Sequence, residues 1–133
     1  MTAPDARVGV DIVTASSLQT RFDGRDDLLH EVFTQAELDY CRAQARPWMH
    51  LAARFAAKEA TLKALGSGLS GAMTWWEVEV TRDETGAPGL AFHGAVGAAV
   101  RAGGLAEARV SLSHTGDHAI AVVDETSFVK TGD

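Results

Sequence analysis

The sequence predicts an α+β fold: a small antiparallel sheet with helices on one of its sides and one long central helix among them. Three observations predict it. Residues 47–65 form one continuous helical pattern. Short β-rich runs occur near both ends of the chain and in its middle. The later runs are separated by tight turns, which favours antiparallel pairing because parallel strands need long crossover connections.

A first strand and three short helices are expected before the long helix. Residues 8–13 are β-rich and predict the strand, although Asp11 interrupts its apolar character. Residues 16–22 and 26–32 predict two short helices, with Gly24 between them. Thr34 and Glu37 have the spacing of a capping box, in which each side chain bonds the other residue's backbone N–H. They predict a third helix that runs to about residue 45.

The long helix and a glycine-rich loop follow. Pro47 suits the first turn of a helix because its missing N–H would have no helical partner there. Gly66 is a typical stop signal, so we expect the helix to span residues 47–65. Residues 66–71 then form a loop whose glycine amides could approach a phosphate closely, although most such loops are only linkers.

The C-terminal half is expected to contain two pairs of strands and one helix. Residues 75–81 alternate and predict a strand, which a turn at 83–86 connects to a return strand that begins at 90–92. Residues 94–102 predict a helix. The last two strands are expected at 109–114 and 119–123, before a frayed tail at 126–133.

Composition narrows the class of protein. The 133 residues suit a single domain, with a core of about residues 7–125. The apolar runs are too short and too often interrupted by charge to span a bilayer, and residues 1–5 show no signal pattern. The one cysteine, Cys41, excludes an intrachain disulfide, and these features together favour a cytoplasmic protein. The net charge of −6 argues against general nucleic-acid binding.

A carboxylate at the edge of an apolar helix face is the first candidate for chemistry. At about 100° per residue, Phe55 and Leu62 share one face of the long helix, and Glu59 lies at its edge between Lys58 and Lys63. A carboxylate between two ammonium groups suits metal-assisted chemistry on a phosphate. The spacing alone also fits an ordinary surface salt bridge, since Glu59 and Lys63 are four residues apart.

Three blocks of sequence together resemble a known family. They are Gly9-Val10-Asp11 in the first strand, Phe55-Ala56-Ala57-Lys58-Glu59-Ala60 with Lys63-Ala64 in the long helix, and Val110-Ser111-Leu112-Ser113-His114-Thr115 near the end. In this order, and over nearly the whole chain from about residue 8 to residue 123, they resemble the holo-acyl-carrier-protein synthase family of 4′-phosphopantetheinyl transferases. The resemblance implies that family's fold.

The resemblance also implies a reaction. The protein would transfer the phosphopantetheine arm of coenzyme A to a serine of an acyl carrier protein and release adenosine 3′,5′-bisphosphate, with Mg²⁺ at the pyrophosphate. Asp11 and Glu59 match the metal-binding carboxylates, which suits Mg²⁺ because it often takes one or two carboxylates beside phosphates and waters. Lys63 matches a lysine near the scissile phosphate, where it would stabilise charge on the leaving side. The base for the serine stays open between Glu59 and a metal-bound water that Glu59 activates.

The resemblance assigns the coenzyme A site to residues that are individually ordinary. Ser113, His114 and Thr115 match the family's terminal motif and would hold the adenosine and its 3′-phosphate, with Arg54 as a further phosphate partner. By itself, His114 fits a half-buried histidine at a strand end equally well, and Arg54 fits a solvated surface charge. The other expected coenzyme A contacts are Lys58, Gly66 and Pro88.

The chain departs from the family pattern in three places. Thr14 stands where many members carry a glutamate, and Ala87 replaces the lysine of a Gly-Lys-Pro turn. The carrier-docking segment at residues 14–22 offers only Arg21, with Arg25 just beyond, whereas that of the family is usually rich in basic residues. This predicts an unusual carrier, such as one of a specialised polyketide or fatty-acid system. Since family members assemble as trimers with sites between subunits, we also expect a homotrimer.

Two other classes of function stay open. One is a non-catalytic relative that binds coenzyme A or a carrier protein, against which the intact Asp11, Glu59 and Lys63 argue. The other is a small α+β interaction domain with an accidental motif. The remaining singular residues have structural interpretations. We expect Trp75 and Trp76 to be core and edge aromatics and Cys41 to be a buried or semi-buried helical residue, and His30, His50, His93 and His118 have no metal-ligand spacing.

Overall fold

The computed structural model describes residues 6–126 and confirms the α+β fold. The expected tail at 126–133 lies outside the described residues except for Thr126, which ends the last strand and is not part of a tail. The elements in chain order are β1 (Ala6–Thr14), α1 (Ala15–Phe22), α2 (Asp26–Val32), α3 (Gln35–Arg42), α4 (Pro47–Leu65), the 3₁₀ helix η1 (Trp75–Glu77), β2 (Val78–Arg82), β3 (Pro88–Phe92), α5 (Gly94–Ala102), β4 (Arg109–Thr115) and β5 (His118–Thr126).

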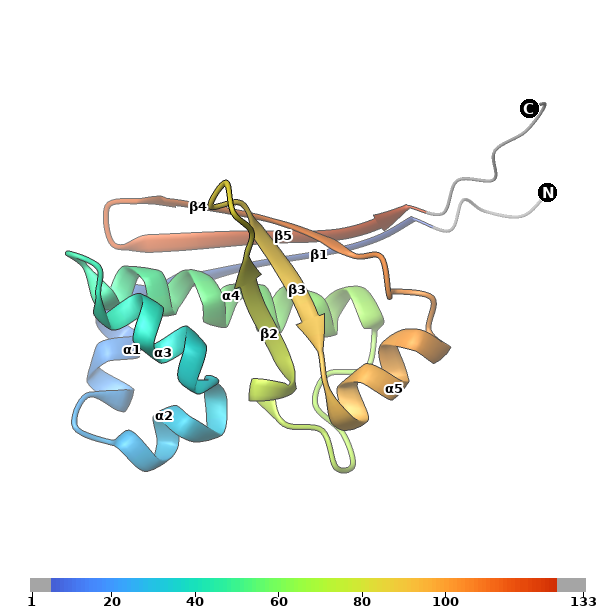
Figure 1. The fold of residues 1–133 in the computed structure, drawn as a ribbon, viewed down its shortest axis with the longest axis horizontal. Coiled ribbons are helices and arrows are strands. Elements are labelled where there is room, and N and C mark those ends of the chain that lie inside the picture. The colour runs from blue at the N-terminus through green and yellow to red at the C-terminus, as the bar shows by residue number, and fades with distance from the viewer. Residues whose placement is uncertain (1–5, 127–133) are drawn as a thin grey trace.

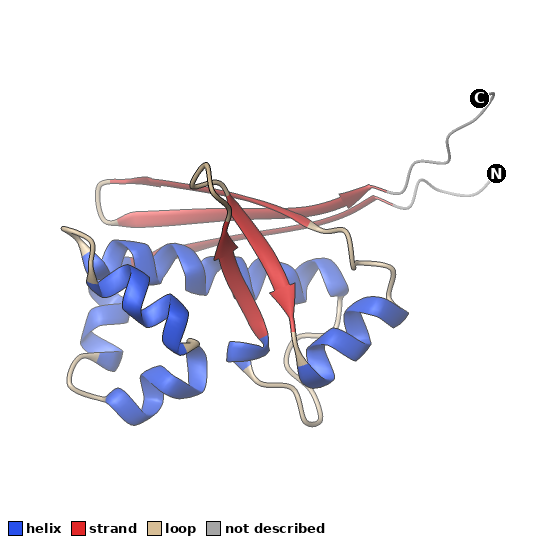
Figure 2. Ribbon diagram, in the orientation of Figure 1, coloured by secondary structure: helices blue, strands red, loops and turns tan. Residues whose placement is uncertain are grey.

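The long helix α4 lies at the centre of this arrangement. A three-stranded sheet runs along one side of α4, and the β2–β3 hairpin crosses another side of it (Figure 1). Helices α1–α3 gather at one end of the molecule, and α5 lies at the other (Figure 2). Of the 19 residues of α4, 13 are buried, so it is a core helix and its outer surface is small. None of the helices in the described part of the chain is long and apolar enough to cross a bilayer.

Both sheets are antiparallel, as the short connections predict. The larger one has the order β1-β5-β4, so that β1 and β4 are its two edges, and β2 pairs with β3 separately. In β1, Gly9 and Asp11 alternate with Val8, Val10 and Ile12. Because successive side chains point to opposite faces of a strand, Gly9 and Asp11 face α4 while the three apolar residues face outward. The predicted first strand therefore carries its acidic residue toward the core helix.

Close packing between β1 and α4 depends on a glycine. A Cβ atom placed on Gly9 would lie 1.8 Å from the carbonyl oxygen of Ala60 and 2.9 Å from the backbone nitrogen of Ala64. Neither backbone atom can move independently of its helix. The small side chains Ala56, Ala57 and Ala60 are fully buried on α4 and allow the sheet to approach equally closely along that face. The strand and the helix are thus held within backbone contact of each other.

The boundaries of two predicted elements were wrong. Residues 75–77 form a 3₁₀ helix, and the strand begins only at Val78, because the backbone N–H of Glu77 bonds the carbonyl of Thr74 and the side chain of Glu77 accepts the N–H of Thr74. A short turn of this kind overrides the alternating pattern. Helix α3 ends at Arg42 and not near residue 45. Its predicted start is confirmed, since both hydrogen bonds of the Thr34–Glu37 capping box are present.

The core is divided by α4 into two clusters. One lies with α1–α3 and includes Leu18, Leu29 and Phe33, and it also contains Cys41, which is fully buried as predicted. The other lies between α4, α5 and the strands and is built from alanines and valines. Trp75 is partly buried against the first cluster, and Trp76 is 39% exposed, which matches the expected core and edge positions.

Replacing Gly9 by alanine should destabilise the fold strongly. The added methyl group meets backbone atoms of α4 that cannot rotate away, and overpacking of this kind costs about 1–3 kcal/mol or more. The free energy of unfolding, measured by urea denaturation, should fall by at least that amount.

Gly89→Ala is the matched control for this substitution. At Gly89 the nearest atom to an added Cβ is the side-chain hydroxyl of Thr81 at 3.0 Å, which can rotate. Its effect should stay within about 0.5 kcal/mol, as is usual for replacements away from the core. Equal stability of the Gly9→Ala variant and the wild type would refute the close contact.

Candidate functional site

The first cluster of predicted site residues lies between β1 and α4. The ammonium group of Lys63 donates to Oδ1 of Asp11 at 2.7 Å and to the carbonyl oxygen of Val10 at 3.2 Å. Glu59, one turn earlier on α4, lies on the same side of the helix as Lys63. The Asp11 side chain is only 12% exposed, whereas that of Lys63 is 56% exposed. The structure therefore brings together Asp11, Glu59 and Lys63, which are far apart in sequence.

The electrostatics of this cluster show two carboxylates competing for one cation. Burial raises the pKa of the Glu59 carboxyl, the neighbouring Asp11 carboxylate raises it further, and Lys63 lowers it. The hydrogen bond to Asp11 raises the pKa of the Lys63 ammonium group. The ion pair that Lys63 forms is with Asp11, so the simple surface pair between Glu59 and Lys63 does not describe this site.

The pair Asp11 and Glu59 suits a hard divalent cation. Their mutual repulsion favours protonation of Glu59, and a cation between them would relieve that repulsion. Within residues 6–126, no group of three or more Asp, Glu, His or Cys side chains is placed to hold a metal. A cation bound here would thus have two carboxylates and would leave its other positions to ligand oxygens and water, an arrangement that Mg²⁺ accepts.

A second cluster surrounds a cavity of about 200 Å³ on the other side of α4. Its polar lining comes from His50 and Arg54 on α4, Arg82 on β2 and Ser113 and His114 on β4, with Pro88 of β3 at its wall. Burial lowers the pKa of His50, and the positive charge of Arg54 lowers it further. Arg54 is 3% exposed, so it is not the solvated surface charge that its sequence context allows. The predicted contacts Arg54, Pro88, Ser113 and His114 therefore line one cavity.

The terminal motif is divided between the two faces of the sheet. His114 pairs with the buried Ala119, so its side chain lies on the inner face, toward the cavity. Ser113 pairs with Ile120, which in turn pairs with Ile12, so the side chain of Ser113 belongs to the outer face. Thr115 follows the same alternation as Ser113. All three residues of the motif are exposed, and both Ser113 and His114 belong to the lining of the cavity at Arg54.

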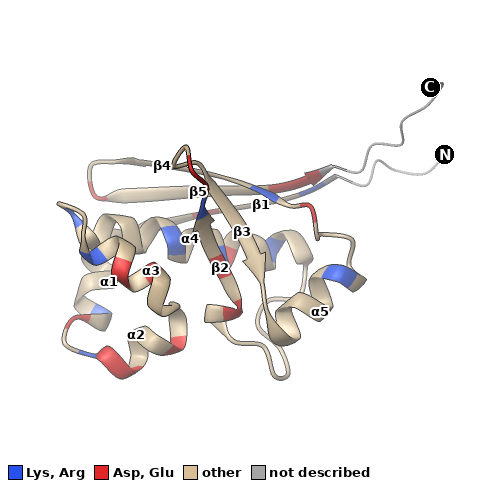
Figure 3. Ribbon diagram, viewed as in Figure 1, with Lys and Arg blue, Asp and Glu red and all other residues tan. Residues whose placement is uncertain are grey.

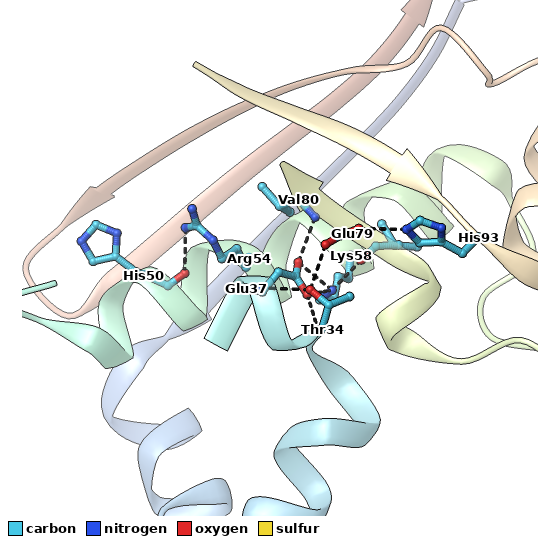
Figure 4. A network of polar contacts seen from close by, with 9 residues as sticks. Thr34, Glu37, His50, Arg54, Lys58, Glu79, Val80 and His93 are labelled. Carbon is cyan, nitrogen blue, oxygen red and sulfur yellow. Dashed lines mark hydrogen bonds and ion pairs between the residues drawn. The ribbon is translucent and has the colours of Figure 1, made fainter. Parts of the chain in front are cut away.

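Lys58 is buried in a network of hydrogen bonds and is not available as a contact for coenzyme A. Its side chain is 0% exposed, and its ammonium group donates to both carboxylate oxygens of Glu37, at 2.8 and 2.9 Å, and to the carbonyl oxygen of Val78 (Figure 4). Lys58 and Glu59 are neighbours in sequence, but adjacent helical positions differ by about 100°, so the two side chains point to different sides of α4. Burial lowers the pKa of Lys58, whereas Glu37 raises it.

The buried Lys58–Glu37 pair joins three elements. Glu37 of α3 also accepts the backbone N–H of Val80 in β2 at 2.8 Å, and Glu79 links the hydroxyl of Thr34 to His93 (Figure 4). Removing one member of a buried ion pair costs about 3–5 kcal/mol because the other charge stays desolvated. We therefore assign Lys58 to the scaffold that positions the β2–β3 hairpin beside Arg54 and no longer count it among the coenzyme A contacts.

Gly66 occupies the helix stop that the sequence predicts. Its φ of 88° is left-handed, and its N–H bonds the carbonyl oxygen of Leu62 at 2.9 Å. The glycine-rich loop that follows is exposed. Three residues in or against the second cluster were not predicted from sequence: His50, Arg82 and Tyr40. Their signal is purely spatial, because the ring of Tyr40 on α3 contacts both Arg54 and Arg82.

The two clusters lie at opposite edges of the larger sheet. Asp11 belongs to the edge strand β1 and His114 to the edge strand β4, with β5 between them. Two strand spacings amount to about 10 Å, and α4 packs beneath the sheet between the clusters (Figure 1). Charges of both signs are otherwise scattered over the molecule, as Figure 3 shows. The chain thus has two groups of charged residues on different sides of one helix. We call Asp11, Glu59 and Lys63 the carboxylate half, and His50, Arg54, Arg82 and His114 the cationic half.

The sequence of this chain is similar to those of proteins from a single family. The profile described as the 4′-phosphopantetheinyl transferase superfamily matches residues 7–123. The holo-[acyl-carrier-protein] synthase of Moorella thermoacetica is 45% identical over 125 residues, which are 93% of this chain and 97% of that protein. The corresponding protein of Geobacter sulfurreducens is 45% identical over 120 residues, covering 86% and 92% of the two chains.

Solved structures of holo-[acyl-carrier-protein] synthases share the fold of this chain. The holo-[acyl-carrier-protein] synthase of Neisseria meningitidis superimposes with a TM-score of 0.78 at 28% identity, over 92% of this chain and 98% of that one. A complex with coenzyme A of the synthase from Chronobacterium ammoniagenes superimposes with a TM-score of 0.77 at 29% identity, over 90% and 95% of the chains.

Glu59→Gln should make the metal-free protein more stable at pH 7. The folded state raises the pKa of Glu59 above its ordinary value of 4.5, so the stability that this group contributes is complete below 4.5 and is lost as the pH rises through the folded-state pKa. Glutamine stays neutral at every pH, so the free energy of unfolding of the variant should exceed that of the wild type only above about pH 4.5. Urea unfolding in a chelator, at a series of pH values, measures the difference.

The exposed Glu84 of the hairpin turn provides the control for charge removal. Glu84→Gln should leave the pH dependence of stability nearly unchanged, since exposed charges contribute little. A Glu59→Gln variant that is less stable than the wild type at pH 7 without metal would contradict the raised pKa.

Proposed function

Since the chain belongs to the holo-[acyl-carrier-protein] synthase family of 4′-phosphopantetheinyl transferases, we propose that it transfers phosphopantetheine from coenzyme A to a serine of an acyl carrier protein. In this reaction a bond forms between the serine oxygen and the phosphorus that carries the pantetheine arm. The bond from that phosphorus to adenosine 3′,5′-bisphosphate breaks, and the serine loses its proton. The observation that best supports the proposal is the cluster of Asp11, Glu59 and Lys63.

The carboxylate half would provide the reaction centre. Mg²⁺, when bound by Asp11 and Glu59, would neutralise charge on the phosphates. Glu59 lies beside Asp11 and Lys63, and it is the proposed acceptor of the serine proton, either directly or through a metal-bound water. Lys63 is exposed enough to reach a phosphate oxygen, where its ammonium group would stabilise the charge of the leaving bisphosphate.

The cationic half would hold the adenosine end of coenzyme A. The guanidinium of Arg54 and the ring of His114 face the cavity of about 200 Å³, whose apolar wall includes Pro88. Guanidinium groups bind phosphate oxygens through two parallel N–H bonds, which fixes the orientation of the ligand. Gly66 would admit the donor at the end of α4, because a glycine carries no side chain to obstruct it.

A homotrimer would explain how these halves work together. They lie at opposite edges of the sheet, and its outer face carries Ser113 and Thr115 on β4 and Val10 and Ile12 on β1, with β5 between the two strands. Val10 is 48% exposed and Ile12 60%, an apolar surface on which a second copy of the chain could pack. In the proposed assembly, the carboxylate half of one subunit meets the cationic half and outer-face residues of the next.

The carrier would dock on a groove beside the carboxylate half. This groove, of about 450 Å³, has Phe22, Phe55 and Trp75 in its lining and the cations Arg21 and Arg25 beside them. Both arginines are exposed and suit an acidic carrier, but they are few. We keep the proposal of a carrier from a specialised polyketide or fatty-acid system, which predicts faster transfer to a weakly acidic carrier than to a strongly acidic one.

Incubation with coenzyme A, Mg²⁺ and an apo acyl carrier protein should add the mass of one phosphopantetheine group to the carrier. Glu59→Gln should reduce the rate by about 100-fold or more, since a lost proton acceptor has effects of that size. Intact-protein mass spectrometry over time measures both rates. Chelation of divalent metal should stop the transfer, and added Mg²⁺ should restore it.

The matched control for the transfer assay is Glu84→Gln, which removes an exposed charge far from the cluster and should transfer at the wild-type rate. A carrier that forms a complex without gaining mass would identify a non-catalytic binder. Wild-type rates in the Glu59→Gln variant would refute the role of Glu59.

Ile12→Lys should convert the proposed trimer into single chains. The substitution places a charge on an apolar surface that the assembly would bury, without touching the inner face of β1. Light scattering after size exclusion should give the mass of three chains for the wild type and of one for the variant. Leu69→Lys, which changes an apolar loop residue that is 38% exposed, is the control and should remain trimeric. A monomeric wild type would refute the assembly.

A further inference from the structure

Two arginine side chains share one aromatic ring at the cavity on the cationic side of α4. The guanidinium carbon of Arg54 lies 4.5 Å from the centroid of the Tyr40 ring, and that of Arg82 lies 4.3 Å from the same centroid. Cation–π contacts of this kind hold a guanidinium in place without using its N–H groups. The donors of both arginines are therefore left for other partners.

Neither arginine has a carboxylate partner among residues 6–126. The hydrogen bond recorded for the Arg54 side chain there is from Nη1 to the carbonyl oxygen of His50 at 3.3 Å, although Arg54 is only 3% exposed. A guanidinium has five N–H donors, and no arginine nitrogen of residues 6–126 is both buried and without a partner, so the unpaired donors of Arg54 open onto the cavity. The guanidinium groups of Arg54 and Arg82 thus give this cavity positive charge that no carboxylate of residues 6–126 pairs with.

The acidic groups nearest to these arginines are committed elsewhere. Glu37 accepts from Lys58 and from the N–H of Val80. Glu79 accepts from the hydroxyl of Thr34 and contacts the ring of His93. Asp83, which follows Arg82 directly, accepts from the side chain and the N–H of Thr85 and from the N–H of Ala87 within its own turn. The arrangement keeps the cationic site free of internal anions.

The β2–β3 hairpin is shaped to place Arg82 at this cavity. Arg82 pairs with Pro88, so their side chains share a face of the hairpin, and both line the cavity with Arg54. A Cβ atom on Gly86 would lie 2.8 Å from Nη2 of Arg82, and Gly86 has a φ of 89°. A glycine is thus needed both for the turn and for the position of the guanidinium.

We propose that Arg82, held with Arg54 on the ring of Tyr40, is a specificity-determining residue that binds the 3′-phosphate of the donor. The inference rests on the proposed function for the identity of the donor. A phosphomonoester dianion matches two guanidinium groups in charge and in hydrogen-bond geometry. Arg82 then allows the protein to distinguish coenzyme A from 3′-dephospho-coenzyme A, which are alike in every other part.

The test compares two nucleotides that differ by that one group. Isothermal titration calorimetry measures the affinity of the full chain for adenosine 3′,5′-bisphosphate and for adenosine 5′-monophosphate. Arg82→Gln should weaken the bisphosphate about 10- to 100-fold, because charge-assisted hydrogen bonds are lost, and should leave the monophosphate within about twofold.

Arg101→Gln is the matched control, since it removes an exposed arginine on α5, at the far end of the molecule. It should change neither affinity by more than about twofold. Equal bisphosphate affinity in the wild type and the Arg82→Gln variant would overturn the proposal, as would an equal loss for both nucleotides. Circular dichroism on each variant checks that the fold is retained, which the exposure of Arg82 favours.

A transfer assay distinguishes a failure of the Arg82 proposal from a failure of the proposed transferase function. With coenzyme A as donor, Arg82→Gln should raise KM by the same 10- to 100-fold factor at little change in kcat, and with 3′-dephospho-coenzyme A the two proteins should have equal KM. If no carrier is modified but the bisphosphate is still preferred through Arg82, the anion site stands and the transferase function falls. If transfer proceeds and Arg82→Gln has no effect on either donor, the function stands and the role of Arg82 falls.

Discussion

The backbone contact between β1 and α4 is the constraint on which the rest of the structure depends. Gly9 lies so close to Ala60 that any larger residue would collide with the helix backbone. Two positions further along β1, the same face carries Asp11, which is thereby brought to Lys63 and beside Glu59. The distance between sheet and helix therefore determines the charge balance of the carboxylate half, including the raised pKa of Glu59. A strand held further away would leave these groups as separate surface charges.

The opposite side of α4 depends on a different interaction, the buried ion pair of Lys58 and Glu37. This pair attaches α3 and β2 to the central helix through one ammonium group and one carboxylate. It positions Tyr40 and Arg82 beside Arg54 without using the donors of either arginine. The stabilising pair and the ligand-facing cations are thus different residues, so an anion can bind on this side without disturbing the scaffold.

The position of α4 between the two clusters determines how far apart the two proposed binding sites lie within one chain. A helix only about 10 Å in diameter separates the proposed site for a divalent cation from the proposed site for a phosphomonoester. Because the outer face of the sheet is apolar and also carries Ser113 and Thr115, the surface that would join subunits is continuous with residues expected at the donor. Assembly and donor binding would then be coupled.

The sequence by itself determined the element order, the capping box of Thr34 and Glu37, the ends of α4 and the pairing of strands across tight turns, because these depend on neighbours a few residues apart. It also supplied the residues of the carboxylate half through their resemblance to a family. The tertiary structure decided which side of α4 each charged residue occupies. Lys58 and Glu59 are adjacent in the chain, yet one is buried against Glu37 and the other faces Asp11. It likewise decided the 3₁₀ turn at Trp75 and the grouping of Tyr40, Arg54 and Arg82, since those contacts join segments that only folding brings together.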